Sequence, residues 1–569
     1  MKILTLTTPY LTCYRYKLAL YIMITLSTTA IALVTPQILG NFLDVLVSGG
    51  DLVYVLRFCA VFGGLSILRI ILGYAASVIY VKIQTKAGYD LNMDAIKHVQ
   101  NASLSYSEKQ DAAYLNQRIN NDANNLIIFC ITILQNVMTN AVMLIVPFVV
   151  LIHMNWMIAL LLMIFLVVYI LSYSIFKKPL YKANFAFKEA QSKFFAHMYD
   201  QFKYIKLIKI NSIQSEINQR ADISFDGLFF SAVRKQKISH LYSGLDGFIT
   251  TLAQITLFVV GGIQILSGNF TIGMFTIFSS YFNMMLGAGR YFFNLGANYQ
   301  NTLVAYNRIE EVFEQRLESY GNIAVNDIQK IEIENISFSY ANKTLLDQKC
   351  DTESLIAPKN PNTTNENILN NFSTTFEKGK IYCISGENGT GKSTLISLIM
   401  GMYINEIEGS IRFNGVNIKE IDMPKIRRTL FGFAEQEPTL INDTIWYNLT
   451  FEEATDGYES NKHDVKYESL TTPLQTLNMT DFIEKNTLNL IINDKNSNTS
   501  GGEKQKIAIL KVLTKDSPVM IFDEPASALD AQTNDRFMRY LQQAKRGKII
   551  ILISHDEEVK RLCDEVVRL

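Results

Sequence analysis

The chain lacks an excess of charge of either sign, because its 53 Lys and Arg residues balance its 53 Asp and Glu residues. Nucleic-acid-binding proteins usually present a basic excess, so the composition argues against a polyanion as partner. The six cysteines are scattered without paired spacing, which argues against a disulfide framework and against a zinc site. What the chain does contain is unevenly distributed, because apolar residues gather in residues 1–305 and charged residues follow them. A length of 569 residues allows roughly two to four domains.

The first half contains apolar stretches that are long enough, and poor enough in charge, to cross a membrane as helices. These stretches cover roughly 18–42, 55–81, 126–152, 155–176, 245–267 and 271–304. The first lacks a small-residue cleavage site at its end, which favours a retained helix over a signal peptide. We therefore expect an all-α transmembrane domain of six helices over residues 16–306.

The connections between these stretches alternate between short ones without Lys or Arg and long ones rich in both residues. The long connections, near 82–125 and 177–244, belong in the cytoplasm by the positive-inside rule, together with both termini. Apolar periodicity within them, as at 202–208, predicts helices that continue well past the bilayer. The sequence thus predicts a multi-pass protein of the cell membrane with a cytoplasmic lead at 1–15.

Two arginines interrupt the apolar stretches, Arg69 in the second and Arg290 in the sixth. A cation within a membrane is costly unless it is paired or hydrated, so each is a candidate functional residue. For Arg69 we favour a water-filled cavity. For Arg290 a structural arginine, bonded to another helix or near the cytoplasmic end, is equally plausible.

A phosphate-binding motif of the form G-x-x-x-x-G-K-[ST] follows in the second half. It comprises Gly386, Glu387, Asn388, Gly389, Thr390, Gly391, Lys392 and Ser393. Its glycines let backbone N–H groups surround a phosphate, Lys392 reaches the terminal phosphate oxygens, and the Ser393 hydroxyl can ligate Mg²⁺. A buried strand at 380–385 precedes it, and a helix opens at Lys392 and runs on through Thr394, which is the required strand–loop–helix context. We expect an α/β P-loop nucleotide-binding domain over 331–569, after a linker at 307–330.

Two further strands end in residues that suit phosphoryl transfer. The apolar run at 519–522 leads into Asp523 and Glu524, as in a Walker B strand. Asp523 is expected to hold Mg²⁺ through water, and Glu524 to polarise the attacking water. A second run at 549–553 leads to His555, which we interpret as a contact to the γ-phosphate rather than a structural histidine.

A short cluster, Ser500-Gly501-Gly502-Glu503, lies between the P-loop and the Walker B strand. With the motifs above, it makes the chain resemble a half-transporter of the ATP-binding cassette (ABC) superfamily, of the six-helix exporter type, over nearly its whole length. The resemblance implies further roles: an adenine-stacking aromatic at Tyr340, a Mg²⁺-sensing Q-loop glutamine at Gln436, a signature motif at 500–503, a D-loop ending at Asp530 and a switch histidine at His555.

The resemblance also implies how such a chain works. ATP, with Mg²⁺, is sandwiched between the P-loop of one cassette and the signature motif of another, so the working unit is a dimer. The implied function is ATP-driven export of an amphipathic drug, a lipid or a peptide across the cytoplasmic membrane. An importer built on the same scaffold and an ATP-gated channel or regulator are the alternatives. Coupling is expected through the long cytoplasmic connections, near Asn116–Asp122 and Ile210–Glu216, docking beside Gln436.

The chain departs from the family pattern at several places. Thr499 and Glu503 stand where the family usually has Leu and Gln. Such changes fit tolerated drift in a homodimer, which we slightly favour, or one subunit of a heterodimer. The polar segment at 347–366 is longer than usual and is expected to be a surface loop, and the sequence given ends before the closing hairpin and helix of such cassettes.

Overall fold

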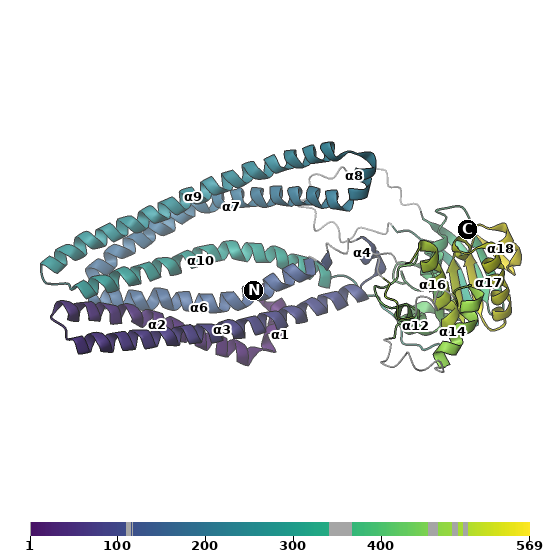
Figure 1. Ribbon diagram of the computed structural model, residues 1–569, viewed down its shortest axis with the longest axis horizontal. Coiled ribbons are helices and arrows are strands. Elements are labelled where there is room, and N and C mark those ends of the chain that lie inside the picture. The colour runs from purple at the N-terminus through teal and green to yellow at the C-terminus, as the bar shows by residue number, and fades with distance from the viewer. Residues whose placement is uncertain are drawn as a thin grey trace. The chain divides into compact units, whose positions relative to one another are not determined.

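The computed structural model describes residues 2–109, 115–116, 118–340, 367–452, 465–480, 488–492 and 499–569. The segment at 347–366, expected as a surface loop, lies outside these residues. Contacts divide the chain into two compact units (Figure 1). The first, the helical unit, comprises Met1–His98 and Ala112–Glu314, and the second, the cassette unit, comprises Val99–Asp111 and Gln315–Leu569.

The helical unit consists of long helices joined by short turns. In chain order they are α1 (Lys2–Thr12), α2 (Arg15–Val47), α3 (Leu52–Asn101), the π-helical turn η1 (Arg118–Asp122), α6 (Ala123–Met154), α7 (Trp156–Lys203), α8 (Ile205–Asn211), α9 (Gln214–Leu266) and α10 (Ile272–Phe313). Among the described residues, five helices are long and apolar enough to cross a membrane: α2, α3, η1 continued by α6, α7 and α9. The sixth expected span lies in α10, which is continuous but more polar because of residues such as Ser279, Ser280 and Asn283.

Small residues let these helices approach closely, as they commonly do in membranes. A Cβ atom on Gly273 of α10 would lie 2.1 Å from the carbonyl oxygen of Gly40 in α2. At the same contact the carboxylate of Asp44 accepts hydrogen bonds from the Thr271 hydroxyl (2.7 Å) and the Gly273 N–H (2.6 Å). The end of α2 therefore caps the start of α10.

The π-helical turn η1 is bonded into the helical unit. The guanidinium of Arg118 donates to the carboxylate of Glu311 and, over 2.7 Å, to the carbonyl oxygen of Arg308, both in α10. The side chain of Arg118 is only 4% exposed. Asp122 lies 3.8 Å from the guanidinium of Arg308. Two residues of the first segment expected to couple to the cassette, Arg118 and Asp122, thus contact α10.

The cassette unit is an α/β fold with two sheets. The four-stranded antiparallel sheet has the order β2-β1-β4-β5, with β1 at Lys330–Phe338, β2 at Leu369–Glu377, β4 at Glu408–Phe413 and β5 at Val416–Asn417. The five-stranded parallel sheet has the order β6-β7-β8-β3-β9, with β3 at Ile381–Ser385, β6 at Phe431–Ala434, β7 at Val519–Asp523, β8 at Ile549–Ile553 and β9 at Glu565–Arg568. Helices of this unit include α4 (Leu104–Lys109), α11 (Lys392–Ile399), α12 (Met423–Thr429), α13 (Ile445–Thr450), α14 (Val465–Thr476), α16 (Gly501–Lys515), α17 (Ala531–Ala544) and α18 (Glu557–Leu562), with short 3₁₀ turns at Ile418–Glu420, Pro525–Ala528 and Lys545–Gly547.

The parallel sheet is fully buried at its centre, as the continuous apolar strands predict. Every residue of β7 and of β8 is buried. Since β8 pairs with both β7 and β3, the carboxyl ends of the three strands lie at one edge of the sheet. Ligands of open α/β sheets bind outside the carboxyl ends of the strands, so this edge is where a site is expected.

Candidate functional site

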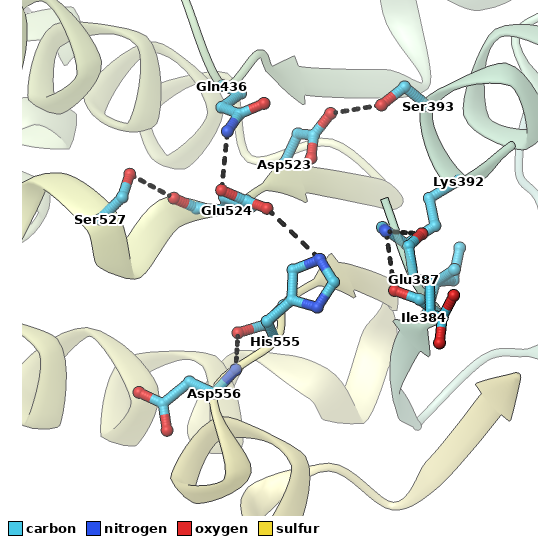
Figure 2. A network of polar contacts seen from close by, with 12 residues as sticks. Ile384, Glu387, Lys392, Ser393, Gln436, Asp523, Glu524, Ser527, His555 and Asp556 are labelled. Atoms are coloured by element: carbon cyan, nitrogen blue, oxygen red, sulfur yellow. Dashed lines mark hydrogen bonds and ion pairs between the residues drawn. The ribbon is translucent and has the colours of Figure 1, made fainter. Parts of the chain in front are cut away.

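The P-loop connects β3 to α11. Gly389 and Gly391 have φ values of 87° and 95°, in the left-handed region that favours glycine, so the motif's glycines are needed for its path. The ammonium of Lys392 folds back into the loop and donates to the carbonyl oxygens of Gly386 (2.9 Å) and Glu387 (2.8 Å) (Figure 2). A positive charge is therefore held inside the loop that is expected to receive phosphates.

Ser393 and Asp523 meet between the P-loop and β7. The hydroxyl of Ser393 donates to a carboxylate oxygen of Asp523 over 3.1 Å (Figure 2). Burial raises the pKa of Asp523, and the charge of Glu524 raises it further, whereas the bond from Ser393 and the charge of Lys392 lower it. One hydroxyl and one carboxylate suit Mg²⁺, a hard cation that usually completes its shell with water and phosphate oxygens. Among the described residues, no cluster of three or more His, Cys, Asp or Glu side chains could hold a metal ion.

Glu524 is the meeting point of three motifs that are far apart in the sequence. The amide nitrogen of Gln436 donates to one of its carboxylate oxygens over 2.7 Å, and Nε2 of His555 lies 3.7 Å from the other (Figure 2). The backbone of Glu524 is left-handed, with φ 48° and ψ 48°. For a non-glycine residue this conformation costs of order 1–3 kcal/mol, and such strain clusters at functional sites.

The signature segment forms the start of α16. The Ser500 hydroxyl accepts from the N–H of Glu503 (3.3 Å), while the Glu503 carboxylate accepts from the N–H of Ser500 (2.6 Å), which is a capping box. Glu503 thus has a local role, which a capping box gives to either Glu or Gln at this position. Ser500 and Gly501 are exposed, and the side chains of Ser500 and Glu503 bond each other.

Asp530 has a capping role of the same kind, because its carboxylate accepts from the N–H and the hydroxyl of Thr533 (both 2.9 Å) at the start of α17. These bonds hold the pKa of Asp530 below its usual value.

Tyr340 belongs to an aromatic cluster at the end of β1. Its ring is 42% exposed and packs edge-on against Phe338 and Tyr403, and its hydroxyl lies 3.0 Å from that of Thr394 in α11. The Tyr403 hydroxyl donates to the carboxylate of Glu108 at 2.9–3.0 Å. Burial raises the pKa of Tyr403, and the bond to Glu108 raises it further.

Sequence reasoning missed α4, which carries Glu108. This short helix packs on the cassette core through Leu104, and the Ser105 hydroxyl donates to Glu406 over 2.6 Å. It also missed Gln505, whose side chain contacts the backbone of Glu524. A helix of six residues in a polar connection gave no periodic signal, and one more glutamine in a helix did not stand out.

Two family models match the chain, the ABC transporter transmembrane region over residues 18–288 and the ABC transporter model over residues 369–527. The chain belongs to the ABC transporter family. Among its relatives, the lactococcin-G-processing and transport ATP-binding protein LagD of Lactococcus lactis subsp. lactis is 24% identical over 510 residues, which are 88% of this chain and 68% of LagD. The ATP-dependent lipid A-core flippase of Haemophilus ducreyi is 24% identical over 509 residues, or 88% of this chain and 82% of the flippase. The chain spans about half (53%) of ABC transporter B family member 6 of Dictyostelium discoideum, at 26% identity over 396 residues.

The fold of this ABC transporter has a counterpart among solved structures. A bacterial Atm1-family ABC exporter with ATP bound superposes with a TM-score of 0.78 at 18% identity, covering 98% of this chain and 93% of that one. The expected fold class, a helical transmembrane region followed by an α/β nucleotide-binding domain, is confirmed. The chain is a multi-pass membrane protein.

The two arginines that interrupt the apolar stretches of this ABC transporter differ in their surroundings. The guanidinium of Arg290 in α10 lies 2.9 Å from the carboxylate of Asp246 in α9 and donates to the Thr250 hydroxyl over 3.5 Å. Arg290 in α10 is therefore paired with a residue of another helix. This pairing agrees with the alternative of a structural arginine bonded to another helix. Arg69 is exposed on α3.

Proposed function

We propose that this chain is one half of a dimeric, ATP-driven exporter of the cytoplasmic membrane. The observation that carries the proposal is the convergence of Lys392, Ser393, Asp523, Glu524 and His555 at one edge of the parallel sheet (Figure 2). The membrane-spanning helices in the same chain make transport the expected use of that site. The proposed domains are the transmembrane domain at 16–306 and the cassette at 331–569, joined by the linker at 307–330.

In the proposed reaction Lys392 neutralises the β- and γ-phosphate oxygens, and the remaining P-loop N–H groups orient them. The Glu524 carboxylate accepts a hydrogen bond from the attacking water and orients it, while His555 Nε2 contacts the γ-phosphate from the end of the neighbouring strand β8. Gln436, which bonds to Glu524, controls whether that carboxylate is free to orient water. Ser393 and Asp523 would hold Mg²⁺, with Gln436 as its sensor, and the bound ion would neutralise charge that develops on the phosphate oxygens.

The proposed dimer follows from the geometry of one cassette. The signature segment is exposed, and its helix N-terminus offers N–H groups to an anion, so it suits the γ-phosphate held by another cassette. A homodimer remains slightly favoured, because the capping box accounts for Glu503 without invoking an asymmetric partner. Closure of two cassettes on ATP would then turn a central cavity outward, with both termini and the cassettes in the cytoplasm.

The cargo is proposed to be an amphipathic drug, a lipid or a peptide. LagD is named for processing and transport, and a second relative is named a lipid A-core flippase, which support export over the importer and gated-channel alternatives. No observation in the chain favours those alternatives over export.

Transport by inverted membrane vesicles tests the proposal. Full-length protein is incorporated with its cassettes outside, and a panel of labelled amphipathic drugs, lipids and peptides is supplied with ATP. We expect ATP-dependent accumulation of one class and stimulation of ATP hydrolysis by the same class. Uptake in right-side-out vesicles would instead establish an importer, and an ATP-dependent conductance without accumulation would establish a channel.

A further inference from the structure

Gln505 lies in α16, the helix that begins at the signature segment, and its side chain points into the cassette. It is 6% exposed. Its amide nitrogen donates to the backbone carbonyl oxygen of Glu524 over 3.0 Å. The Ser527 hydroxyl oxygen lies 3.1 Å from both polar atoms of the Gln505 amide and 2.9 Å from the same Glu524 carbonyl oxygen.

These bonds converge on a strained backbone. Glu524 has a left-handed conformation that non-glycine residues rarely adopt, so its surroundings must hold it there. Its N–H donates to the carbonyl oxygen of Ile553 (3.0 Å), and its carbonyl oxygen also accepts from the N–H of Ser527 (3.2 Å). Gln505 reaches this peptide from α16. It therefore holds the peptide from a different element than β7, β8 and the turn that follows β7.

The carboxylate and the carbonyl of Glu524 are thus fixed by different partners. The carboxylate faces Gln436 and His555, and the carbonyl faces Ser527 (Figure 2). A rotation of the peptide would move the carboxylate away from the place where water must be oriented. A displacement of about 1 Å at a reacting group can cost up to 10²-fold in rate.

We propose that Gln505 is a positioning residue that holds Glu524 in its left-handed conformation and so links the signature helix to the water-orienting carboxylate of the same chain. The inference rests on the proposed function, because it assigns Gln505 a part in ATP hydrolysis. In the proposed dimer, the signature segment of a given chain contacts the ATP bound by its partner. The Glu524 of that same chain acts on the ATP bound at the chain's own P-loop. Gln505 therefore connects the two sites through a single buried side chain.

A purely structural role is the competing explanation, since a buried amide needs hydrogen-bond partners wherever it lies. The two explanations differ in what they change. Positioning affects turnover with little effect on ATP affinity or stability, whereas packing affects stability first. Methionine is the best replacement, because it is unbranched and of similar length but cannot donate a hydrogen bond.

The first experiment compares Gln505→Met with Thr514→Val in full-length protein. Thr514 lies in the same helix, and within the part of the chain that the structure describes its hydroxyl bonds only the helix carbonyl oxygen of Leu510 (2.7 Å), so its removal is a matched control. For Gln505→Met we expect kcat to fall at least ~10-fold, with the affinity for a fluorescent ATP analogue and the melting temperature close to wild type. In nucleotide-free protein, hydrogen–deuterium exchange should accelerate over residues 523–529. Unchanged exchange there, or a melting temperature that falls together with activity, would overturn the proposal.

The second experiment uses mixed dimers, isolated with two affinity tags, that combine Gln505→Met with Glu524→Gln. With both changes on one chain, the remaining Glu524 keeps its own Gln505. With the changes on different chains, the remaining Glu524 loses its Gln505, and we expect hydrolysis at least ~10-fold slower than in the first arrangement. Equal rates would show that Gln505 does not act through the Glu524 of its own chain, and the reverse order would show that it acts through the signature.

Different results would contradict the proposed function and the proposed role of Gln505. If wild-type protein neither dimerises nor hydrolyses ATP, the proposed function is wrong for this chain alone. The exchange measurement on nucleotide-free protein still decides whether Gln505 holds the Glu524 peptide.

Discussion

The side-chain amide of Gln436 donates a hydrogen bond of 2.7 Å to the carboxylate of Glu524. Gln436, which is expected to sense Mg²⁺, is thus bonded to Glu524, which is expected to orient water. This bond occupies one acceptor site of the carboxylate and fixes the orientation in which its other sites can meet water. We infer that Gln436 restrains Glu524 until the metal and the γ-phosphate offer the amide another partner.

Glu524→Gln is expected to retain ATP binding and cassette closure while turnover falls at least ~10²-fold, because water positioning is a transition-state role. Turnover and the binding of an ATP analogue should be measured on the same purified dimer. Normal hydrolysis in this variant would refute the assignment of Glu524. If the chain is half of a heterodimer, the wild type should hydrolyse poorly alone and recover activity with its partner.

Lys392→Ala is expected to abolish nucleotide binding and not only turnover, because it removes the cation held inside the P-loop. Equilibrium binding of a fluorescent ATP analogue is the measurement. Lys419→Ala is a suitable control, since it removes a lysine of the same unit outside the P-loop. An affinity near that of the wild type would mean that the loop is not the phosphate site.

Tyr403→Phe is expected to raise the KM for ATP about 5-fold with kcat preserved, as the loss of one net hydrogen bond of about 1 kcal/mol implies. The change keeps the ring against Tyr340 but removes the bond to Glu108. Ser105→Ala is the matched control, because it loosens α4 from Glu406 without touching the aromatic cluster. If both variants raise KM equally, α4 docking and not the orientation of Tyr340 sets the affinity.

Glu216→Lys is expected to spare basal ATP hydrolysis while reducing transport by roughly 2- to 30-fold, the range of typical coupling energies. Glu216 is exposed in the first turn of α9, so its reversal disturbs no buried contact. Arg118→Glu should reduce transport too, but with a lower melting temperature, because Arg118 is buried against Glu311. Normal transport by Glu216→Lys, or loss of ATP binding, would place the coupling site elsewhere.

Contiguous motifs and long apolar runs carried most of what the sequence could predict. The P-loop could be found because its backbone conformation demands glycines at fixed spacing, and Gly389 and Gly391 do take the left-handed conformation. Glu524 and His555 could be assigned to one edge of a sheet because each follows a continuous apolar strand. The helices of the first unit could be predicted because crossing a bilayer requires length and apolarity.

Contacts between residues far apart in the chain could not be predicted from the sequence. Glu108 and Tyr403 are 295 positions apart, and neither belongs to a periodic pattern from which the contact could be predicted. Arg118 lies in a polar connection, where a charged side chain is usually exposed. Its burial could not be predicted, because it depends on the ion pair with Glu311 of α10. The roles of Glu503 and Asp530 as helix caps could have been predicted, since each lies at the appropriate position of a helix start.

The strand order of the parallel sheet dictates when the nucleotide site can form during synthesis. Neither β3 nor β7 pairs with the other, and β8 joins them. The ribosome makes β8, at residues Ile549–Ile553, long after the P-loop. Until that strand emerges, the P-loop strand and the strand bearing Asp523 have no common neighbour, and the edges of β3 and β7 that face β8 stay unpaired. We therefore expect a chain that has not completed β8 to lack the edge at which Lys392, Asp523 and Glu524 converge, and its unpaired strand edges to favour aggregation.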